Sequence, residues 1–255
     1  EYNLPIVAVV AENDFGGCVR IRSVGYVPSE LPTYPGADDD YLSKKPGLFP
    51  DPIYDMTNGE IKVIPFQWRS IWVDFEPREF TPAGSCTIHI KFISKNGTTL
   101  GEVIKPIEII DAKLPKQELI YTNWFHCDCI GTYYRVEMLS EPHWQLIERY
   151  VKTACEHGMN MILTPLFTPP LDTKVGGERP TVQLVGVKYE NGEYSFDFSK
   201  LKRFIDMCLK QGIEYFEMSH LFTQWGAFAA PKIIAEVDGV EKRIFGWDTK
   251  ASGPE

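Results

Sequence analysis

The stretch LKRFIDMCLKQGIEYFEMSHLF, residues 201–222, contains a helix pattern, a stop and a strand pattern in direct succession. Its first half spaces apolar side chains three and four residues apart, which predicts a helix with one buried face; these side chains are Leu201, Phe204, Ile205, Cys208 and Leu209. Gly212 then ends the helix, because glycine readily adopts the left-handed conformation found just past a helix terminus. The apolar run that begins at Ile213 is therefore predicted to be a strand, with His220 near its carboxyl end.

The preceding segment shows the same order of elements. LIYTNWFHC (119–127) is predicted to be a strand, Ser140 to cap a helix that ends at Gly158, and NMILTPLF (160–167) to be the next strand. The resulting β-α-β-α-β order predicts parallel strands with right-handed crossovers.

Three strands do not close a barrel, since a (β/α)8 barrel takes at least about 200 residues. We therefore expect residues 119–255 to be the N-terminal portion of a (β/α)8 TIM-type barrel that is truncated here. Long insertions follow the second and third strands, over 166–198 and 221–250, with hairpin turns expected at Asn191-Gly192 and Asp238-Gly239. Because α/β folds build their sites at the carboxyl ends of parallel strands, these insertions should border a pocket.

Residues 1–113 show a different pattern, with short strands and no sustained helical period. In SCTIHIKFI (85–93), for example, apolar and polar residues alternate. Asn58-Gly59 and Asn96-Gly97 predict hairpin turns, and the proline- and glycine-rich run 28–52 predicts a long loop.

These features predict a multi-domain chain that begins with an antiparallel β-sandwich accessory domain over 1–113. Trp68 and Trp72 fit the core of this sandwich. The polar segment 111–118 is expected to link it to the barrel portion, 119–255.

The composition argues against several classes of function. The 255 residues include 26 basic and 35 acidic side chains, for a net charge of −9, which disfavours nucleic acid and anionic membranes as partners. No apolar run approaches the roughly 18–20 residues of a membrane span. No signal peptide opens the chain, although a processed N-terminus would look the same.

The six cysteines do not form the pattern of a disulfide scaffold. Cys127 and Cys129 are the one close pair, whereas a zinc site needs about four ligands. Cys155 and Cys208 fall on the apolar faces of the predicted helices and are interpreted as core. We therefore predict no metal site and no cofactor.

Aromatic and polar side chains gather at the predicted strand ends and in the loops that follow them. Tryptophan faces suit the apolar faces of sugar rings, while His, Gln and Asp side chains can hydrogen-bond hydroxyl groups. His220 is also suited to acid–base chemistry, because an unperturbed imidazole titrates near neutral pH. The alternative is that these residues only pack the loops. The candidate substrate-binding residues, which we call the rim, are Trp124, His126, His220, Gln224, Trp225, Trp247 and Asp248.

Glycosidases generally need two carboxylates about 5 to 9.5 Å apart. The sequence does not pair the available ones, which are Asp128, Asp172, Glu217 and Asp248. In the glycine-rich segment VGGERPT (175–181), the simplest interpretation is that Glu178 forms an ion pair with its neighbour Arg179.

Five segments taken together carry a resemblance to a known family: YTNWFHCDC, ILTPLFTPPLDT, GGERPTVQL, HLFTQWGA and IFGWD. They resemble the start of the barrel in glycoside hydrolase family 123 and its uncharacterised relatives. These are β-N-acetylgalactosaminidase-type enzymes in which a β-sandwich precedes the barrel. The resemblance is close over roughly 119–250 and only architectural over 1–113.

This resemblance implies retaining, substrate-assisted hydrolysis of a β-linked N-acetylhexosamine, most of all N-acetylgalactosamine, in which the 2-acetamido oxygen attacks the anomeric carbon. An adjacent Asp-Glu pair would orient that group and supply the acid, but the chain contains no Asp-Glu dipeptide. The pair is expected beyond residue 255, so the catalytic residues are unknown and this fragment is expected to be inactive. The alternative is a non-catalytic protein that binds carbohydrate through the same rim.

The resemblance further implies a bacterial, exported protein, extracellular or periplasmic, whose partner is an oligosaccharide or glycoconjugate glycan. It leaves the oligomeric state open.

Overall fold

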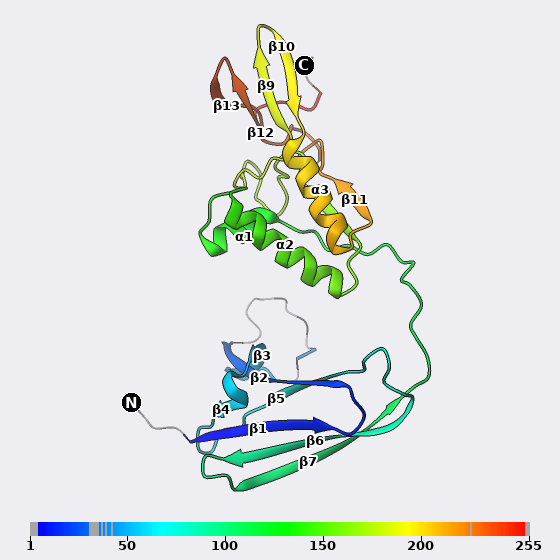
Figure 1. The fold of residues 1–255 in the computed structure, drawn as a ribbon. Coiled ribbons are helices and arrows are strands. Elements are labelled where there is room, and N and C mark those ends of the chain that lie inside the picture. The colour runs from blue at the N-terminus through cyan, green and yellow to red at the C-terminus, as the bar shows by residue number, and fades with distance from the viewer. Residues whose placement is uncertain are drawn as a thin grey trace. The chain divides into compact units, whose positions relative to one another are not determined.

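The computed structural model describes residues 5–30, 36, 38, 40, 41, 43–224 and 226–252. The chain divides into two compact units, Glu1–Leu114 and Pro115–Glu255 (Figure 1).

Two antiparallel sheets make up the first unit, one in the order β4-β1-β6-β7 and the other in the order β3-β2-β5. Apolar side chains from both sheets meet in a cluster around Val9, Ile88 and Ile90, so the unit is a β-sandwich. The strands are β1 Ile6–Asn13, β2 Cys18–Ser29, β3 Gly47–Asp55, β4 Glu60–Lys62, β5 Ile71–Glu76, β6 Gly84–Ser94 and β7 Thr99–Ile109.

Two local predictions for this unit were wrong. Both ends of the expected loop 28–52 belong to strands, the first to β2 and the last to β3, and residues 31–35, 37, 39 and 42 lie outside the described residues. β3 tolerates Pro50 and Pro52 because it is an edge strand of its sheet. The expected hairpin at Asn58-Gly59 is instead a short 3-10 turn, Thr57–Gly59, that connects β3 in one sheet to β4 in the other. The hairpin at Asn96-Gly97 is confirmed, since it joins the paired strands β6 and β7.

The expected core positions of Trp68 and Trp72 were also wrong. Trp68 is 91% exposed and Trp72 is 49% exposed. In β5 the alternate residues Ile71 and Val73 pack into the core cluster, so Trp72 between them must face the opposite side of the sheet.

In the second unit the two predicted long helices are confirmed. α2 spans Glu141–Glu156 and is followed by Gly158 with φ +92°, and α3 spans Ser199–Gln211 with Gly212 as its C-cap at φ +115°. Ser140 occupies the N-cap position of α2, but its hydroxyl donates to the Glu137 carbonyl and does not cap the helix.

The core of this unit lies between α2, α3 and the two strands of a parallel sheet. β8, Met161–Thr164, pairs in parallel with β11, Tyr215–Met218, which confirms the strand–helix–strand order around α3. Ile147, Ile162 and Phe204 are fully buried in the cluster, and each such side chain stabilises the fold by about 1.5–3 kcal/mol.

The predicted strand 119–127 was wrong. Its residues form no strand, and α1, Cys127–Tyr134, begins at their end. The segment makes backbone hydrogen bonds to the start of β8 at Tyr121, whose carbonyl accepts from the backbone N–H groups of Asn160 and Met161. Among the described residues the parallel sheet therefore contains β8 and β11, and the barrel stays a prediction.

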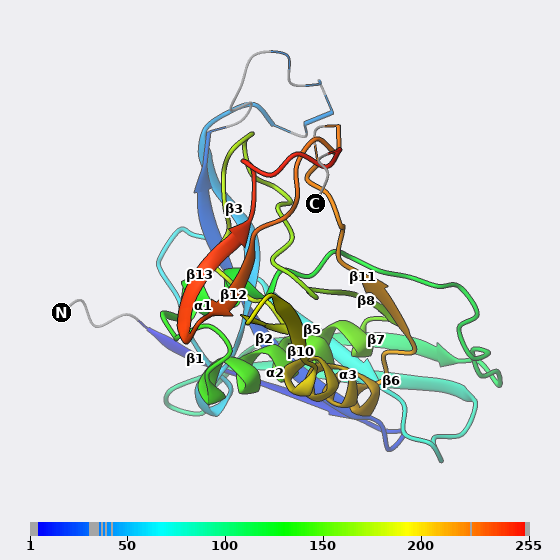
Figure 2. The same cartoon turned by 90° about the horizontal axis from the view of Figure 1, so that it is seen from above.

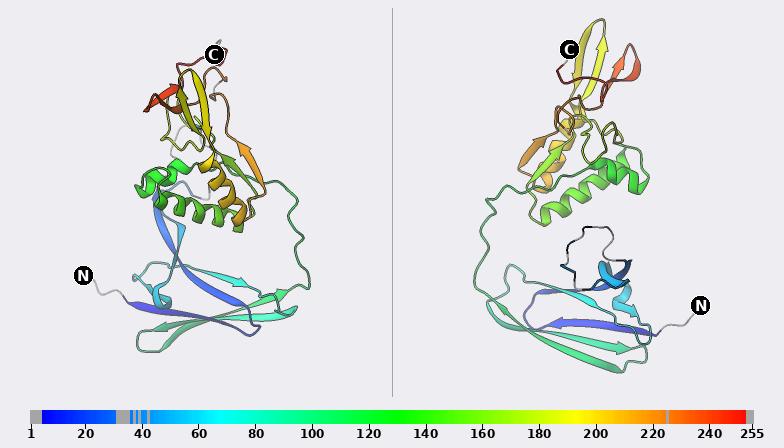
Figure 3. Two further views of the ribbon diagram at one scale, coloured as in Figure 1. Left: turned by 45° about the horizontal axis from the view of Figure 1, so that its top comes forward. Right: turned by 180° about the vertical axis from the view of Figure 1, so that it is seen from behind.

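The two insertions together build a second sheet in the order β10-β9-β12-β13, which lies at one end of the unit (Figure 3). Figure 2 shows its strands β12 and β13 side by side. Both predicted hairpin tips are confirmed, because Asn191-Gly192 and Asp238-Gly239 all have positive φ as a type I′ turn requires. The parallel pairing of β9 with β12 joins one insertion to the other. The strands are β9 Gly186–Glu190, β10 Glu193–Asp197, β12 Ile233–Val237 and β13 Val240–Phe245.

None of the helices in the described part of the chain is both long and apolar enough to cross a membrane.

Candidate functional site

Trp124 and His220, two predicted rim residues, lie in contact beside the carboxyl end of β11. Their rings meet edge to face with centroids 5.6 Å apart. The indole N–H of Trp124 donates to the Glu217 carboxylate at 3.3 Å. Trp124 stays 48% exposed, and such a half-open aromatic surface beside polar groups can bind a sugar ring.

His126 is more enclosed than a rim residue should be. Its side chain is 12% exposed, and its Nε2 lies 2.9 Å from Oδ2 of Asp172. Its Nδ1 is buried without a partner among the described residues. Because an ionised carboxylate only accepts hydrogen bonds, Nε2 is the donor, and His126 orients Asp172.

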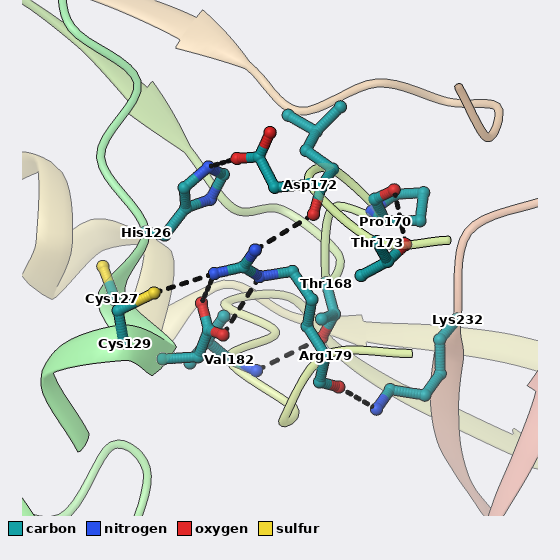
Figure 4. Close-up of polar contacts among 12 residues, drawn as sticks. His126, Cys127, Cys129, Thr168, Pro170, Asp172, Thr173, Arg179, Val182 and Lys232 are labelled. Atoms are coloured by element: carbon teal, nitrogen blue, oxygen red, sulfur yellow. Dashed lines mark hydrogen bonds and ion pairs between the residues drawn. The ribbon is translucent and has the colours of Figure 1, made fainter. Parts of the chain in front are cut away.

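Arg179 lies at the centre of a group of polar contacts with Asp128, Cys129 and Leu171, which we call the polar network (Figure 4). Its guanidinium pairs with Asp128, with Nε 3.0 Å from Oδ2 and Nη2 3.2 Å from Oδ1. It also donates to the Leu171 carbonyl at 3.0 Å and to Cys129 Sγ at 2.9 Å. The two charged side chains are only 9% and 7% exposed, so the loop after β8 is fastened to α1 by a buried ion pair.

The electrostatics of this pair follow from its burial. Burial by itself would lower the pKa of the Arg179 guanidinium, but the hydrogen bond and negative charge of Asp128 outweigh burial and leave the pKa above its usual value. The expected pairing of Glu178 with Arg179 was wrong. Glu178 lies 2.8 Å from Arg243 and 3.7 Å from Lys232, while Lys232 also donates to the Arg179 carbonyl.

The remaining rim residues connect loops to one another. The Trp247 indole donates to the Gly177 carbonyl at 2.7 Å, and Asp248 pairs with Arg243 at 2.8 Å. Gln224 donates to the Thr173 carbonyl at 3.2 Å. Trp225 lies outside the described residues. Trp124 and His220 are thus in contact, His126 lies behind Asp172, and Trp247 and Asp248 belong to a group around Glu178 and Arg243.

Trp124 is one of the residues that line a largely apolar pocket of about 600 Å³. It is lined by Tyr121, Phe125, Tyr134 and Tyr150 among others, and none of Asp128, Asp172, Arg179 and Glu217 lines it. The polar network therefore lies outside this pocket.

Cysteines lie in the core of the second unit, and the described residues contain no cluster of metal ligands. Cys208 is fully buried and Cys155 is partly buried, in agreement with their interpretation as core. Burial raises the pKa of the Cys208 thiol to about 12, so it is neutral at physiological pH. The described part of the chain contains no group of three or more His, Cys, Asp or Glu side chains placed to hold a metal ion.

Sequence reasoning missed Arg179 as the centre of the network and did not assign roles to Asp172 and Glu217. Arg179 contacts Asp128, 51 residues away in the chain. Asp172 contacts His126, 46 residues away, and Glu217 contacts Trp124, 93 residues away. The spacing of neighbouring residues therefore does not reveal these contacts.

Comparison with known proteins adds two findings. The sequence model described as "Glycoside hydrolase 123, catalytic domain" matches residues 124–255. The solved structure of a family 123 glycoside hydrolase from Clostridium perfringens, from a study of glycolipid glycan hydrolysis, has a similar fold with a TM-score of 0.70 at 14% identity. The similarity covers 94% of this chain and 43% of that chain, so this chain spans less than half of the solved protein. No curated protein matches the sequence.

Proposed function

Because the chain belongs to glycoside hydrolase family 123, we propose that the natural polypeptide containing residues 1–255 hydrolyses a glycosidic bond. The observation that carries this proposal is the position of the family match. Residues 124–255 include Trp124 at their first position, together with Glu217, His220 and the Asp172 loop. In this proposal these residues line one side of the sugar site.

We propose a β-linked N-acetylhexosamine, N-acetylgalactosamine above all, as the substrate class. Its 2-acetamido oxygen would attack the anomeric carbon while an acid protonates the departing oxygen, and water would then open the cyclic intermediate with retention. The resemblance supports this route. It assigns orientation and proton donation to an Asp-Glu pair, which the chain of 255 residues lacks and which we place after residue 255.

The architecture in this proposal is a (β/α)8 barrel whose first part is residues 119–255, with 1–113 as a supporting sandwich. The parallel pair β8–β11 with α3 between them supports this assignment, since this is the repeating unit of such a barrel. Export to the periplasm or the cell exterior is proposed from the resemblance alone.

The test is hydrolysis of para-nitrophenyl glycosides by the full natural polypeptide that contains this chain. We expect turnover of the β-N-acetylgalactosaminide and none of the β-galactoside, because only the former carries the acetamido nucleophile. Proton NMR of the first product should show the β-anomer. Glycan binding without turnover of any aryl glycoside would overturn the enzymatic proposal and leave a carbohydrate-binding protein. Residues 1–255 alone should bind without turnover.

A further inference from the structure

The loop after β8 holds Asp172 in an uncommon backbone conformation. Its φ is +55°, in the left-handed region that residues other than glycine seldom occupy, although Asp adopts it more readily than most. Leu171 before it is buried, and the Thr173 hydroxyl after it donates to the Pro170 carbonyl at 3.3 Å. Such conformations persist where the surroundings enforce them, and they cluster at binding sites.

Two enclosed side chains enforce this conformation. His126 holds Oδ2 of the Asp172 carboxylate at 2.9 Å, and Arg179 holds the Leu171 carbonyl at 3.0 Å (Figure 4). Arg179 is itself fixed by its buried pairing with Asp128. The direction of the Asp172 carboxylate is therefore set by His126 at the start of α1 and by Arg179, which Asp128 in α1 holds in place.

The carboxylate nevertheless remains open on its other side. The Asp172 side chain is 67% exposed, and its hydrogen bond to His126 uses Oδ2, which leaves Oδ1 without a hydrogen bond from the described residues. A carboxylate oxygen with free lone pairs is an acceptor for hydroxyl groups, which a sugar supplies in number.

The Asp172 loop and Trp124 are linked through the loop that follows β11. β8, which precedes the Asp172 loop, pairs in parallel with β11, which precedes His220. The His220 ring contacts Trp124, and Gln224 farther along the same loop donates to the Thr173 carbonyl, next to Asp172. The loop after β11 therefore contacts both the Trp124 ring and the Asp172 loop, at the carboxyl end of the parallel strands.

We propose that Asp172 is a specificity-determining residue, which accepts a hydrogen bond from a ring hydroxyl of a sugar that stacks on Trp124. Arg179 is a positioning residue that acts through Asp172. This inference rests on the proposed function, because it requires a sugar at this site.

The first test compares para-nitrophenyl β-N-acetylgalactosaminide with its 3-, 4- and 6-deoxy analogues in the full natural polypeptide. Asp172→Asn should lower kcat/KM for the parent roughly tenfold to hundredfold, mainly by raising KM. The wild type should penalise one deoxy analogue by a similar factor, because its acceptor is then left unpaired. In the Asp172→Asn variant, kcat/KM for that deoxy analogue should be about the same as kcat/KM for the parent substrate. Asp206→Asn is the control, since Asp206 pairs with Lys202 on α3, outside the site.

The second test isolates Arg179. Arg179→Lys keeps the positive charge but loses the two-pronged pairing and the fixed contact to Leu171. It should lower kcat/KM in the wild-type background and cause no further loss beside Asp172→Asn. Additive losses would show that Arg179 does not act through Asp172.

The outcomes separate the two proposals. If the wild type turns over no β-N-acetylhexosaminide, the proposed function fails and Asp172 has no sugar to bind. If the wild type is active and Asp172→Asn stays within about twofold with every deoxy penalty retained, the assignment of Asp172 alone is overturned.

Discussion

Each unit of the molecule contains an arginine–aspartate ion pair, but the two pairs differ in burial. Arg22 and Asp74 lie 2.6 Å apart on the sandwich with 26% and 40% of their side chains exposed. Arg179 and Asp128 lie 3.0 Å apart with 9% and 7% exposed. The exposed pair gains little because water screens both charges, whereas the buried pair must stay together once the fold has desolvated it. The buried pair therefore fixes the position of the Asp172 loop.

Each unit also contains a half-exposed tryptophan whose indole donates to a carboxylate. Trp72 is 49% exposed and donates to Asp74 at 2.8 Å, while Trp124 is 48% exposed and donates to Glu217 at 3.3 Å. Exposure and hydrogen bonding do not distinguish them. Of the two, only Trp124 contacts a histidine ring and lies two residues from His126, which holds the Asp172 carboxylate, so Trp72 is a matched control for Trp124.

The largest expected effect comes from breaking each ion pair. Arg179→Met leaves a buried, unpaired Asp128 charge and should reduce the free energy of unfolding by about 3–5 kcal/mol. Arg22→Met should cost less than about 1 kcal/mol. Urea unfolding followed by circular dichroism measures both. If the two variants lose the same free energy of unfolding, the buried pair is no more important for stability than the exposed one, and the contrast between them fails.

The next effect separates the tryptophans. Trp124→Ala should weaken recognition of the N-acetylgalactosaminide by about 1–2 kcal/mol, or fivefold to thirtyfold, through lost stacking. Trp72→Ala should leave recognition unchanged and alter stability by less than about 1 kcal/mol, since a surface side chain leaves no cavity. Isothermal titration and thermal unfolding check the pair of variants. Equal effects on binding would remove the basis for distinguishing them.

A smaller effect is expected at His220, which supports Trp124 through an edge contact. His220→Ala should weaken sugar recognition by about 0.5–1.5 kcal/mol, the value of one aromatic contact, without lowering the melting temperature. The affinity of Trp124→Ala/His220→Ala then decides its role. If the two losses add in full, His220 binds sugar independently of Trp124.

The smallest effect is a pH dependence in the sandwich. Burial is the largest single influence on Asp74 and opposes its ionisation, but the hydrogen bonds from Trp72 and Arg22 and the positive charge of Arg22 together outweigh burial and lower the pKa of the carboxyl below its usual value of 3.8. The stabilisation is therefore present above about pH 4 and lost as the pH falls through the lowered pKa. It should amount to at most about 1 kcal/mol, because the pair is exposed. Thermal unfolding between pH 2 and pH 6 should show a smaller decline for Asp74→Asn than for the wild type.

Local signals predicted the parts of the fold that depend on neighbouring residues. The apolar spacing of α3 and the glycine at position 212 specify a helix and its end within one segment. The tips at Asn191-Gly192 and Asp238-Gly239 likewise require positive φ at adjacent residues, which the sequence reveals directly. These predictions were confirmed.

Predictions that depend on distant partners failed more often. The segment 119–127 has the composition of a strand but makes too few backbone contacts to become one, and β3 contains two prolines yet pairs as an edge strand. Trp72 lies outside the core because the register of β5 turns its neighbours inward. Whether a segment forms a strand, and which face of the sheet each of its side chains occupies, depend on the pairing with neighbouring strands as well as on the segment itself.

By itself the sequence determined the two long helices α2 and α3, the hairpin tips at Asn96-Gly97, Asn191-Gly192 and Asp238-Gly239, a resemblance to one family and the segments that carry candidate residues. Only the tertiary structure decided which charges meet. Glu178 and Arg179 are adjacent in the chain, yet the former pairs with Arg243 and the latter with Asp128, 51 residues away. The Arg179 side chain is 9% exposed and the Glu178 side chain is 37% exposed, so these neighbours in sequence face different surroundings. The packing of the loop against α1 therefore selects the partner that sequence spacing cannot reveal.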